Sequence, residues 1–211
     1  METIKNIEIK KGKKIIIFDS GRTVWLDRHL SSHIPLEPGT AVEEPVLEEM
    51  ILLYQYPSAL NDAIALLAVR DRSRLEIRQK LSSKKYEPNV IDMVLYKLET
   101  EKLLNDETFS SQWVQTRMKK YGPVRLSQEL RKKGINQNTA RTAMEQISGD
   151  QEIENAVLLA QKKLRTEKKD ISKVKLFQHI TSFLIRRGFS WETAKKAYEI
   201  AMEYDSEKAD D

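Results

Sequence analysis

Few residues in this chain of 211 could support catalytic or metal chemistry. It contains three histidines and no cysteine, which excludes disulfides and thiolate zinc sites. His29 and His33 are four residues apart and could share a helix face, but a metal would need further ligands, and Pro35 limits any helix there. Neither a G-x-x-x-x-G-K loop nor a G-x-G-x-x-G turn occurs. We therefore predict no metal, no cofactor and no catalytic residue, and a protein that is not an enzyme.

Pairs of positive charges are the pattern that does recur. They close three similar segments: RLEIRQKLSSKKY (74–86), YGPVRLSQELRKKGI (121–135) and KLFQHITSFLIRRGF (175–189). Positive charge in the last turn of a helix complements the helix dipole by about 0.3–1 kcal/mol, so a capping role explains any single pair. Three pairs, with further arginines between residues 70 and 78, favour a binding surface as well.

The positive charge is concentrated in the middle of the chain. Lys and Arg minus Asp and Glu give 7 − 9 = −2 for residues 1–56, 17 − 11 = +6 for residues 57–149, and 12 − 12 = 0 for residues 150–211. This distribution predicts that the basic residues of the middle segment contact an acidic partner. The predicted contact set is Arg70, Arg72, Arg74, Arg78, Lys119, Lys120, Arg125, Arg131, Lys132 and Lys133, with Arg186 and Arg187 secondary.

The elements that carry these residues differ between the two ends of the chain. Short β-branched runs separated by glycine turns predict a small antiparallel sheet from Ile4 to Asp27. A helix is expected over Glu43–Tyr54, with Pro45 in its first turn. From Pro57 onward apolar residues recur at helical spacing, in a first helix that carries Ile64 and in a later one that carries Leu158.

An internal repeat of about fifty residues organises the helical part. Alignment on Leu81, Leu130 and Leu184 brings three blocks of three helices into register. The predicted fold class is therefore mainly α, with three tandem helix-turn-helix-like repeats that form an elongated, curved body. The predicted domains are 1–56 (β extension and linker), 57–104, 105–149 and 150–211, the last with a polar tail from Asp205.

The turn after each second helix also has a recognisable pattern. Gly134 and Gly188 fit the left-handed position of a Schellman motif, which brings Leu130 into contact with Ile135. Lys85 takes the equivalent position in the first block. A left-handed lysine costs roughly 1 kcal/mol, unless that helix ends differently.

Targeting signals are not apparent. No apolar run approaches the roughly 18 residues of a membrane span, and the first residues lack the apolar core of a signal peptide. We expect a cytoplasmic protein without membrane contact.

Two binding functions remain open from the residues alone. One is a helix-turn-helix transcriptional regulator, whose third helices would read DNA bases. Those helices read PNVIDMVLYKLE, NQNTARTAMEQI and SWETAKKAYEIA, and they carry few basic residues. The other is a modular protein whose basic surface binds an acidic protein or a nucleoprotein, which the basic middle segment favours.

The sequence resembles the RecX family of bacterial regulatory proteins over roughly Leu60 to Tyr204. The resemblance rests on NDETF (105–109), WVQTR (113–117), YGP (121–123) and RLSQELRKKGI (125–135), and on ALLA (65–68), RDRSR (70–74) and EIRQKL (76–81). Thr108 and Lys85 depart from the family pattern, where Arg and Gly are expected. The N-terminal sheet is similar to the extension of longer members.

Membership of that family implies a function that composition does not. RecX proteins bind RecA, the recombinase that forms filaments on single-stranded DNA, and suppress its ATPase, strand-exchange and coprotease activities in recombination and the SOS response. The resemblance therefore implies a negative regulator that binds RecA and the RecA–single-stranded DNA filament, with weak non-specific DNA contact. We expect it to be a monomer.

Overall fold

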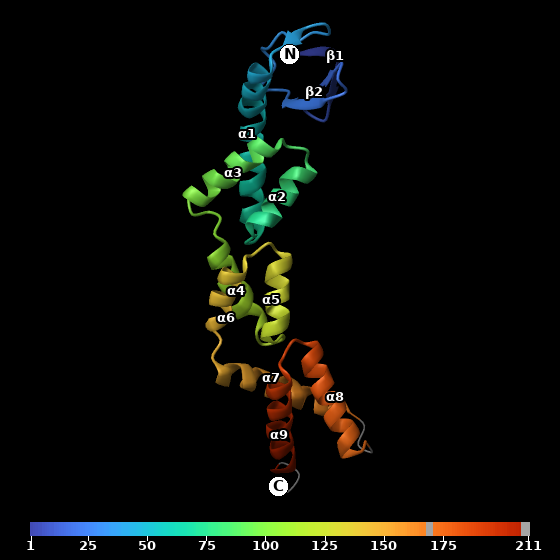
Figure 1. The fold of residues 1–211 in the computed structure, drawn as a ribbon, viewed down its shortest axis with the longest axis vertical. Helices are drawn as coiled ribbons and strands as arrows, with labels where there is room; N and C mark the ends of the chain where they lie inside the picture. Colours follow the sequence, from blue (N-terminus) through green and yellow to red (C-terminus); the bar gives the residue numbers. More distant parts are fainter. Residues whose placement is uncertain (168–170, 208–211) are drawn as a thin grey trace. The chain divides into compact units, whose positions relative to one another are not determined.

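The computed structural model describes residues 1–167 and 171–207, the last three of these by their backbone alone. It divides into two compact units, Met1–Asn105 and Asp106–Asp211. The first unit holds the sheet and the first three helices, and the second holds the other six helices of the described residues (Figure 1).

The predicted N-terminal sheet is confirmed. Strands β1 (Glu2–Lys10), β2 (Lys13–Phe18) and β3 (Thr23–Asp27) form two antiparallel hairpins, and a two-residue strand β4 (Ala41–Val42) pairs with the start of β1. The strand order is β3-β2-β1-β4. Within the described residues every strand precedes the first helix.

The first helix is longer than predicted. Helix α1 runs over Glu44–Val69, straight through Pro57, so the predicted boundary at residue 57 falls inside it. A proline cannot donate the backbone hydrogen bond of a helix interior. Packing outweighs that loss, because Ala59 and Ala63 beyond the proline are fully buried. Gln55 also links this helix to the sheet and to the start of the third helix of the first repeat. Its side chain donates to the Trp25 carbonyl at 2.7 Å and accepts from the Glu87 N–H at 3.0 Å.

The remaining helices follow in groups of three. Helices α2 (Arg74–Ser83) and α3 (Pro88–Thr100) complete the first repeat. Helices α4 (Asp106–Arg117), α5 (Pro123–Lys132) and α6 (Gln137–Glu145) form the second. Helices α7 (Gly149–Leu164), α8 (Lys173–Arg186) and α9 (Trp191–Glu207) form the third. Helix α9 therefore includes the start of the predicted polar tail, whose residues 208–211 lie outside the described part of the chain.

The shared register of the repeats is confirmed by burial. Leu81, Leu130 and Leu184 are completely buried, each in a different hydrophobic cluster. The first cluster is shared by the sheet and the first repeat. Ile64 and Leu158 lie in helices, as predicted, but both side chains are exposed (42% and 58%). Their positions fit a helical period, but the preceding residues, Ala63 and Val157, are the ones that are buried.

The Schellman turns form as predicted. Gly134 adopts φ +80°, and the Ile135 N–H donates to the Leu130 carbonyl at 3.1 Å. Gly188 adopts φ +93° in the same arrangement. Lys85 takes the left-handed conformation as well, with φ +65°, so the first block keeps the turn despite its side chain.

Candidate binding surface

The first-repeat arginines of the predicted contact set already have partners within the chain. Arg70 pairs with Glu76 at 3.0 Å, and the pKa of Arg70 is raised by its hydrogen bond to Glu76. The Nε of Arg72 donates to the Leu66 carbonyl at 3.1 Å. Both side chains therefore brace the loop between α1 and α2.

Arg74 and Arg78 connect α2 to α3. The Nε of Arg74 lies 2.7 Å from a carboxylate oxygen of Glu99, and Arg78 pairs with Asp92. Arg74 is the first residue of α2. The positive charge of these two arginines is on the surface, but the carboxylates of Glu99 and Asp92 on α3 neutralise part of it.

In the second repeat, one carboxylate organises the basic residues. Glu129 accepts from the Nε of Arg117 at 2.8 Å, from the Nε of Arg125 at 3.2 Å and from the indole N–H of Trp113 at 3.2 Å. Partial burial alone would raise the pKa of Glu129. Hydrogen bonds from Arg117 and Arg125 outweigh that effect and hold the pKa below its usual value.

Aromatic rings extend this network toward the third repeat. The guanidinium carbons of Arg125, Arg117 and Arg187 lie 4.0, 5.0 and 5.8 Å from the ring centroid of Tyr121. Such cation–π contacts contribute about 0.5–1 kcal/mol each at exposed sites. The Nζ of Lys133 similarly lies 4.5 Å from the Trp113 ring centroid.

Five members of the predicted set differ from the rest by their exposure and pairing. Their side chains are exposed, and within the described part of the chain no carboxylate lies within 4.0 Å of their charged atoms. They are Lys119, Lys120, Arg131, Lys132 and Arg186. These cations can pair with an external partner without breaking an internal ion pair.

The second and third repeats touch through their backbones. The N–H groups of Gly122 and Val124, at the start of α5, donate to the carbonyls of Arg187 and Gly188 at 2.9 and 3.1 Å. A Cβ on Gly122 would lie 2.4 Å from the Gly188 carbonyl oxygen, and a Cβ on Gly188 would lie 2.5 Å from the Arg125 nitrogen. Glycine is therefore required at both positions. This contact brings Arg125 together with the two secondary residues Arg186 and Arg187.

A polar hollow of about 270 Å³ lies beside this contact, between α5 and the end of α8. Its lining includes three members of the predicted set, Arg125, Lys132 and Arg186, together with Gln128 and Glu129. The hollow is thus the place where the structure collects predicted residues from two repeats.

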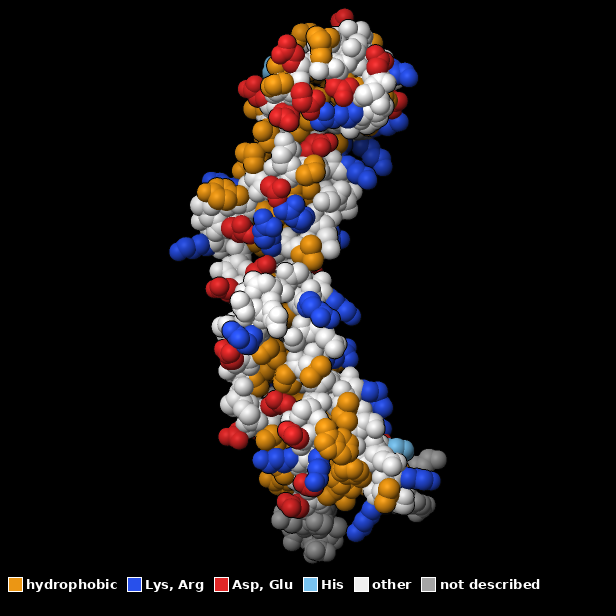
Figure 2. All heavy atoms as spheres, in the orientation of Figure 1, with side chains coloured by type: hydrophobic (Ala, Val, Ile, Leu, Met, Phe, Trp, Pro, Cys, Tyr) orange, Lys and Arg blue, Asp and Glu red, His pale blue; other side chains and the backbone are white. Residues whose placement is uncertain are grey.

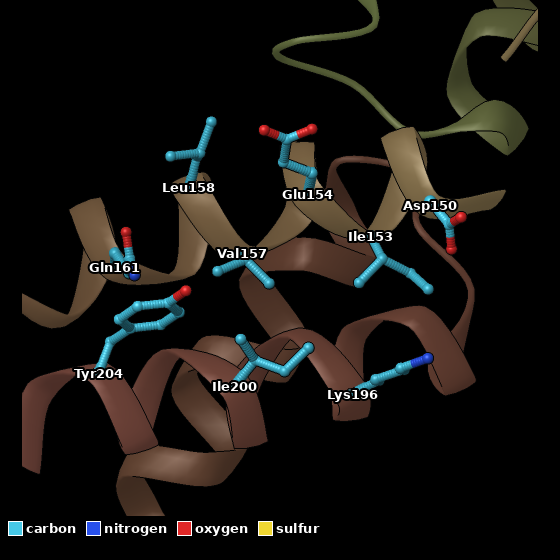
Figure 3. A pocket seen from close by; sticks show the side chains of 9 residues that line it. All are labelled: Asp150, Ile153, Glu154, Val157, Leu158, Gln161, Lys196, Ile200 and Tyr204. Atoms are coloured by element: carbon cyan, nitrogen blue, oxygen red, sulfur yellow. The ribbon is translucent and has the colours of Figure 1, made fainter. Parts of the chain in front are cut away.

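A second hollow, of about 640 Å³, lies between α7 and α9 (Figure 3). Its floor is apolar, with Val157 and Ile200 pointing toward each other and Tyr204 at one end. Asp150 and Lys196 lie at the opposite end. None of the predicted residues lines this hollow.

The charges do not merge into one large basic patch on the face shown in Figure 2, where acidic side chains lie between the basic ones. The sequence indicated most of the cations but not the roles of Glu129, which pairs with Arg125, and of Tyr121, whose ring lies against Arg125 and Arg187. The spacing of Arg125 and Glu129, four apart on one helix, is the signal that could have indicated the pair.

The described residues include no group of three or more His, Asp or Glu side chains arranged to hold a metal ion. His33 instead lies beside Tyr54, with 3.3 Å between its Nε2 and the phenol oxygen. Across the same residues, no helix has both the length and the apolar character needed to span a membrane.

Comparison with known families and proteins identifies the family of this chain. Models of the first, second and third three-helix domains of RecX match residues 59–98, 105–144 and 150–198. A regulatory protein RecX from Clostridioides difficile (strain 630) is 31% identical over 172 residues, which cover 81% of this chain and 80% of that protein. This chain belongs to the RecX family. The RecX of Bacillus subtilis (strain 168) is 29% identical over 92% of this chain and 73% of its own length.

Solved RecX structures are similar to this chain as well. RecX from Lactobacillus salivarius has a TM-score of 0.64 and 27% identity, over 69% of this chain and 96% of that one. Another crystal structure of a regulatory protein RecX has a TM-score of 0.63 over 96% of this chain and all of that one. Its identity is 22%, so this second likeness concerns the RecX fold alone.

Proposed function

We propose that this protein is a negative regulator of RecA, a monomer that binds the RecA–single-stranded DNA filament and inhibits its ATPase, strand-exchange and coprotease activities. The observation that carries the proposal is the match of all three three-helix domains to RecX, in order along the chain. Tandem repeats present residues from several blocks to one extended partner, and a filament is such a partner.

The predicted basic residues remain the proposed contact set, and their internal pairing ranks them. The unpaired cations of the second and third repeats, such as Lys132 and Arg186, would gain a partner on binding. Arg70, Arg74 and Arg78 would exchange one carboxylate for another, which yields less. We therefore place the main contact on the second unit.

Sequence-specific DNA binding is the weaker candidate. A reading helix needs exposed side chains that can hydrogen-bond base edges, and acidic ones repel the phosphates. On α3 the exposed residues include Asp92 and Glu99, and on α9 they include Glu192 and Glu199. These helices are better suited to packing than to the major groove.

The decisive experiment measures RecA ATPase on single-stranded DNA with increasing amounts of this protein. The protein is added either before or after filament formation, so that blocked growth and disassembly can be told apart. We expect ATP hydrolysis to fall in at least one order of addition. Unchanged hydrolysis in both orders would refute the proposal.

Competition between duplexes tests the alternative function. A sequence-specific regulator prefers its site over random duplex by typically 10³-fold or more. We expect weak binding with no preference. Selection of one sequence from a random pool, with strong preference over bulk DNA, would favour the transcriptional regulator.

A further inference from the structure

Positive charge lacks internal partners on both sides of the hollow between α5 and α8. Lys132 and Arg186 line it from the two helices, and no carboxylate among the described residues pairs with either. Arg125 lines it too, but its charge is offset by Glu129 at 3.2 Å. A complementary ligand must therefore bring negative charge to both helices.

Two aliphatic side chains also line the same hollow. Val124 and Ile185 line it with 55% and 42% of their surface exposed. Single-stranded nucleic acids bind through bases stacked on aromatic rings as well as through phosphates. Phe189, next to Gly188, is buried, and the rings of Tyr121 and Phe183 are covered by guanidinium groups, those of Arg125 at 4.0 Å and Arg187 at 4.7 Å. A protein segment supplies both carboxylates and aliphatic side chains, so it fits better than a nucleic acid.

The walls of the hollow are fixed before any ligand arrives. Gly122 and Val124 of the first wall are hydrogen-bonded to the carbonyls of Arg187 and Gly188 at the second. A preformed site loses less conformational entropy on binding than a flexible one. Lys132 and Arg186 are therefore carried on a rigid frame.

We propose that the hollow between α5 and α8 binds an acidic protein segment, whose carboxylates pair with Lys132 and Arg186 and whose aliphatic side chain lies against Val124 and Ile185. This assignment rests on the proposed function, because the segment is taken to belong to RecA. It specifies the partner of these cations as protein rather than DNA.

Labelled probes test the ligand class directly on the full chain, by fluorescence anisotropy. The probes are a short peptide of alternating glutamate and leucine pairs, the same peptide with serine for leucine, and oligo-dT of equal charge. We expect the glutamate–leucine peptide to bind most tightly. Tighter binding of oligo-dT, or no binding of the glutamate–leucine peptide, would overturn the proposal.

Paired substitutions locate the site. Lys132→Ala with Arg186→Ala should weaken binding of the glutamate–leucine peptide about tenfold, since two exposed ion pairs contribute up to about 1 kcal/mol each. Val124→Ser with Ile185→Ser should reduce its advantage over the serine peptide. Lys162→Ala with Lys175→Ala removes two exposed lysines of the third repeat outside the hollow, and should change binding less than twofold. Equal weakening by the hollow and control pairs would mean diffuse attraction and would contradict the assignment.

RecA inhibition by the same variants separates this proposal from the broader one. If the wild type inhibits RecA and both hollow variants, confirmed as folded by circular dichroism, inhibit equally well, the hollow assignment fails while the proposed function stands. If the wild type binds the glutamate–leucine peptide through the hollow but leaves RecA unaffected, RecA regulation fails and the assignment to RecA fails with it.

Discussion

The α2–α3 turn and the α8–α9 turn have the same backbone but different residues at the left-handed position. The backbone N–H of Tyr86 donates to the Leu81 carbonyl in the first turn, and the backbone N–H of Phe189 donates to the Leu184 carbonyl in the second. The left-handed residue is Lys85 in the first and Gly188 in the second. What covers each turn explains the difference.

Side chains cover the first turn, whereas backbone covers the second. The indole N–H of Trp25 donates to the Lys85 carbonyl at 2.6 Å, and the Nζ of Lys13 donates to the Lys84 carbonyl at 3.1 Å. These long side chains approach from the sheet and leave room for a Cβ. At Gly188 the start of α5 is so close that a Cβ would meet the Arg125 backbone. The left-handed conformation tolerates lysine at a modest cost, but the close backbone approach does not.

Among the substitutions that test this difference between the two turns, Gly188→Ala should lower the stability most. The left-handed alanine costs about 1–2 kcal/mol, and the forced shift of α5 adds about 1–3 kcal/mol. We expect the free energy of unfolding to fall by about 2–5 kcal/mol in urea denaturation. Gly21→Ala is the control, because Gly21 has φ +86° and nothing lies within 4 Å of its added Cβ. Equal losses for the two variants would mean that the close approach contributes nothing.

Glu129→Gln tests the carboxylate that pairs with Arg125, the residue whose backbone lies against Gly188 in the α8–α9 turn. Removing a partly buried carboxylate leaves Arg117 and Arg125 without their ion pair, and we expect a loss of about 1–3 kcal/mol at neutral pH.

The pH dependence of that loss provides a second measurement. The folded pKa of Glu129 lies below its usual value, so its contribution is present above the unfolded pKa, about 4.3. The contribution disappears as the pH falls through the folded pKa. The difference between wild type and variant should therefore shrink in acid, and a constant difference would contradict this role.

Tyr86→Phe tests the cover of the first turn. The Tyr86 hydroxyl donates to Asp62 at 2.6 Å, and burial and that hydrogen bond raise the pKa of the phenol. Loss of a hydrogen bond to a half-buried carboxylate should cost about 1–2 kcal/mol. Thermal unfolding at neutral pH measures it. A variant as stable as the wild type would show that Lys84, 2.6 Å from Asp62, suffices as its partner.

Lys85→Gly should have the smallest effect and the opposite sign. Glycine adopts φ +65° without steric cost, so we expect the protein to become more stable by about 0.5–1 kcal/mol. Lys84→Gly is the matched control and should destabilise, because Lys84 has φ −84° and pairs with Asp62. A loss of stability in Lys85→Gly would mean that the lysine side chain itself stabilises the turn.

The sequence predicted what depends on local periodicity and missed what depends on distant partners. The buried positions of Leu81, Leu130 and Leu184 follow from spacing alone, as do the turns at Gly134 and Gly188. The course of α1 through Pro57 depends on burial in the core that the sheet and the first repeat share, which no local rule contains.

The same distinction holds for the candidate binding surface. The basic residues could be recognised from composition, but which of them have an ion-pair partner within the chain could not. Glu99, which pairs with Arg74, is 25 positions away in the sequence. The contact between Gly122 and Arg187 joins two different repeats. Which cations remain unpaired is therefore a property of the tertiary structure.

Helix α1 makes the sheet and the first repeat one thermodynamic unit. Its 26 residues extend over about 39 Å at 1.5 Å per residue, and the cluster that contains Leu47 also contains Phe18 and Leu98. Melting either end of the helix would strip packing from both partners, so amide protons in β2 and α3 should exchange with solvent through the same global opening. Pro57 interrupts the hydrogen-bond ladder between them, and any smaller, local opening of the helix should begin there.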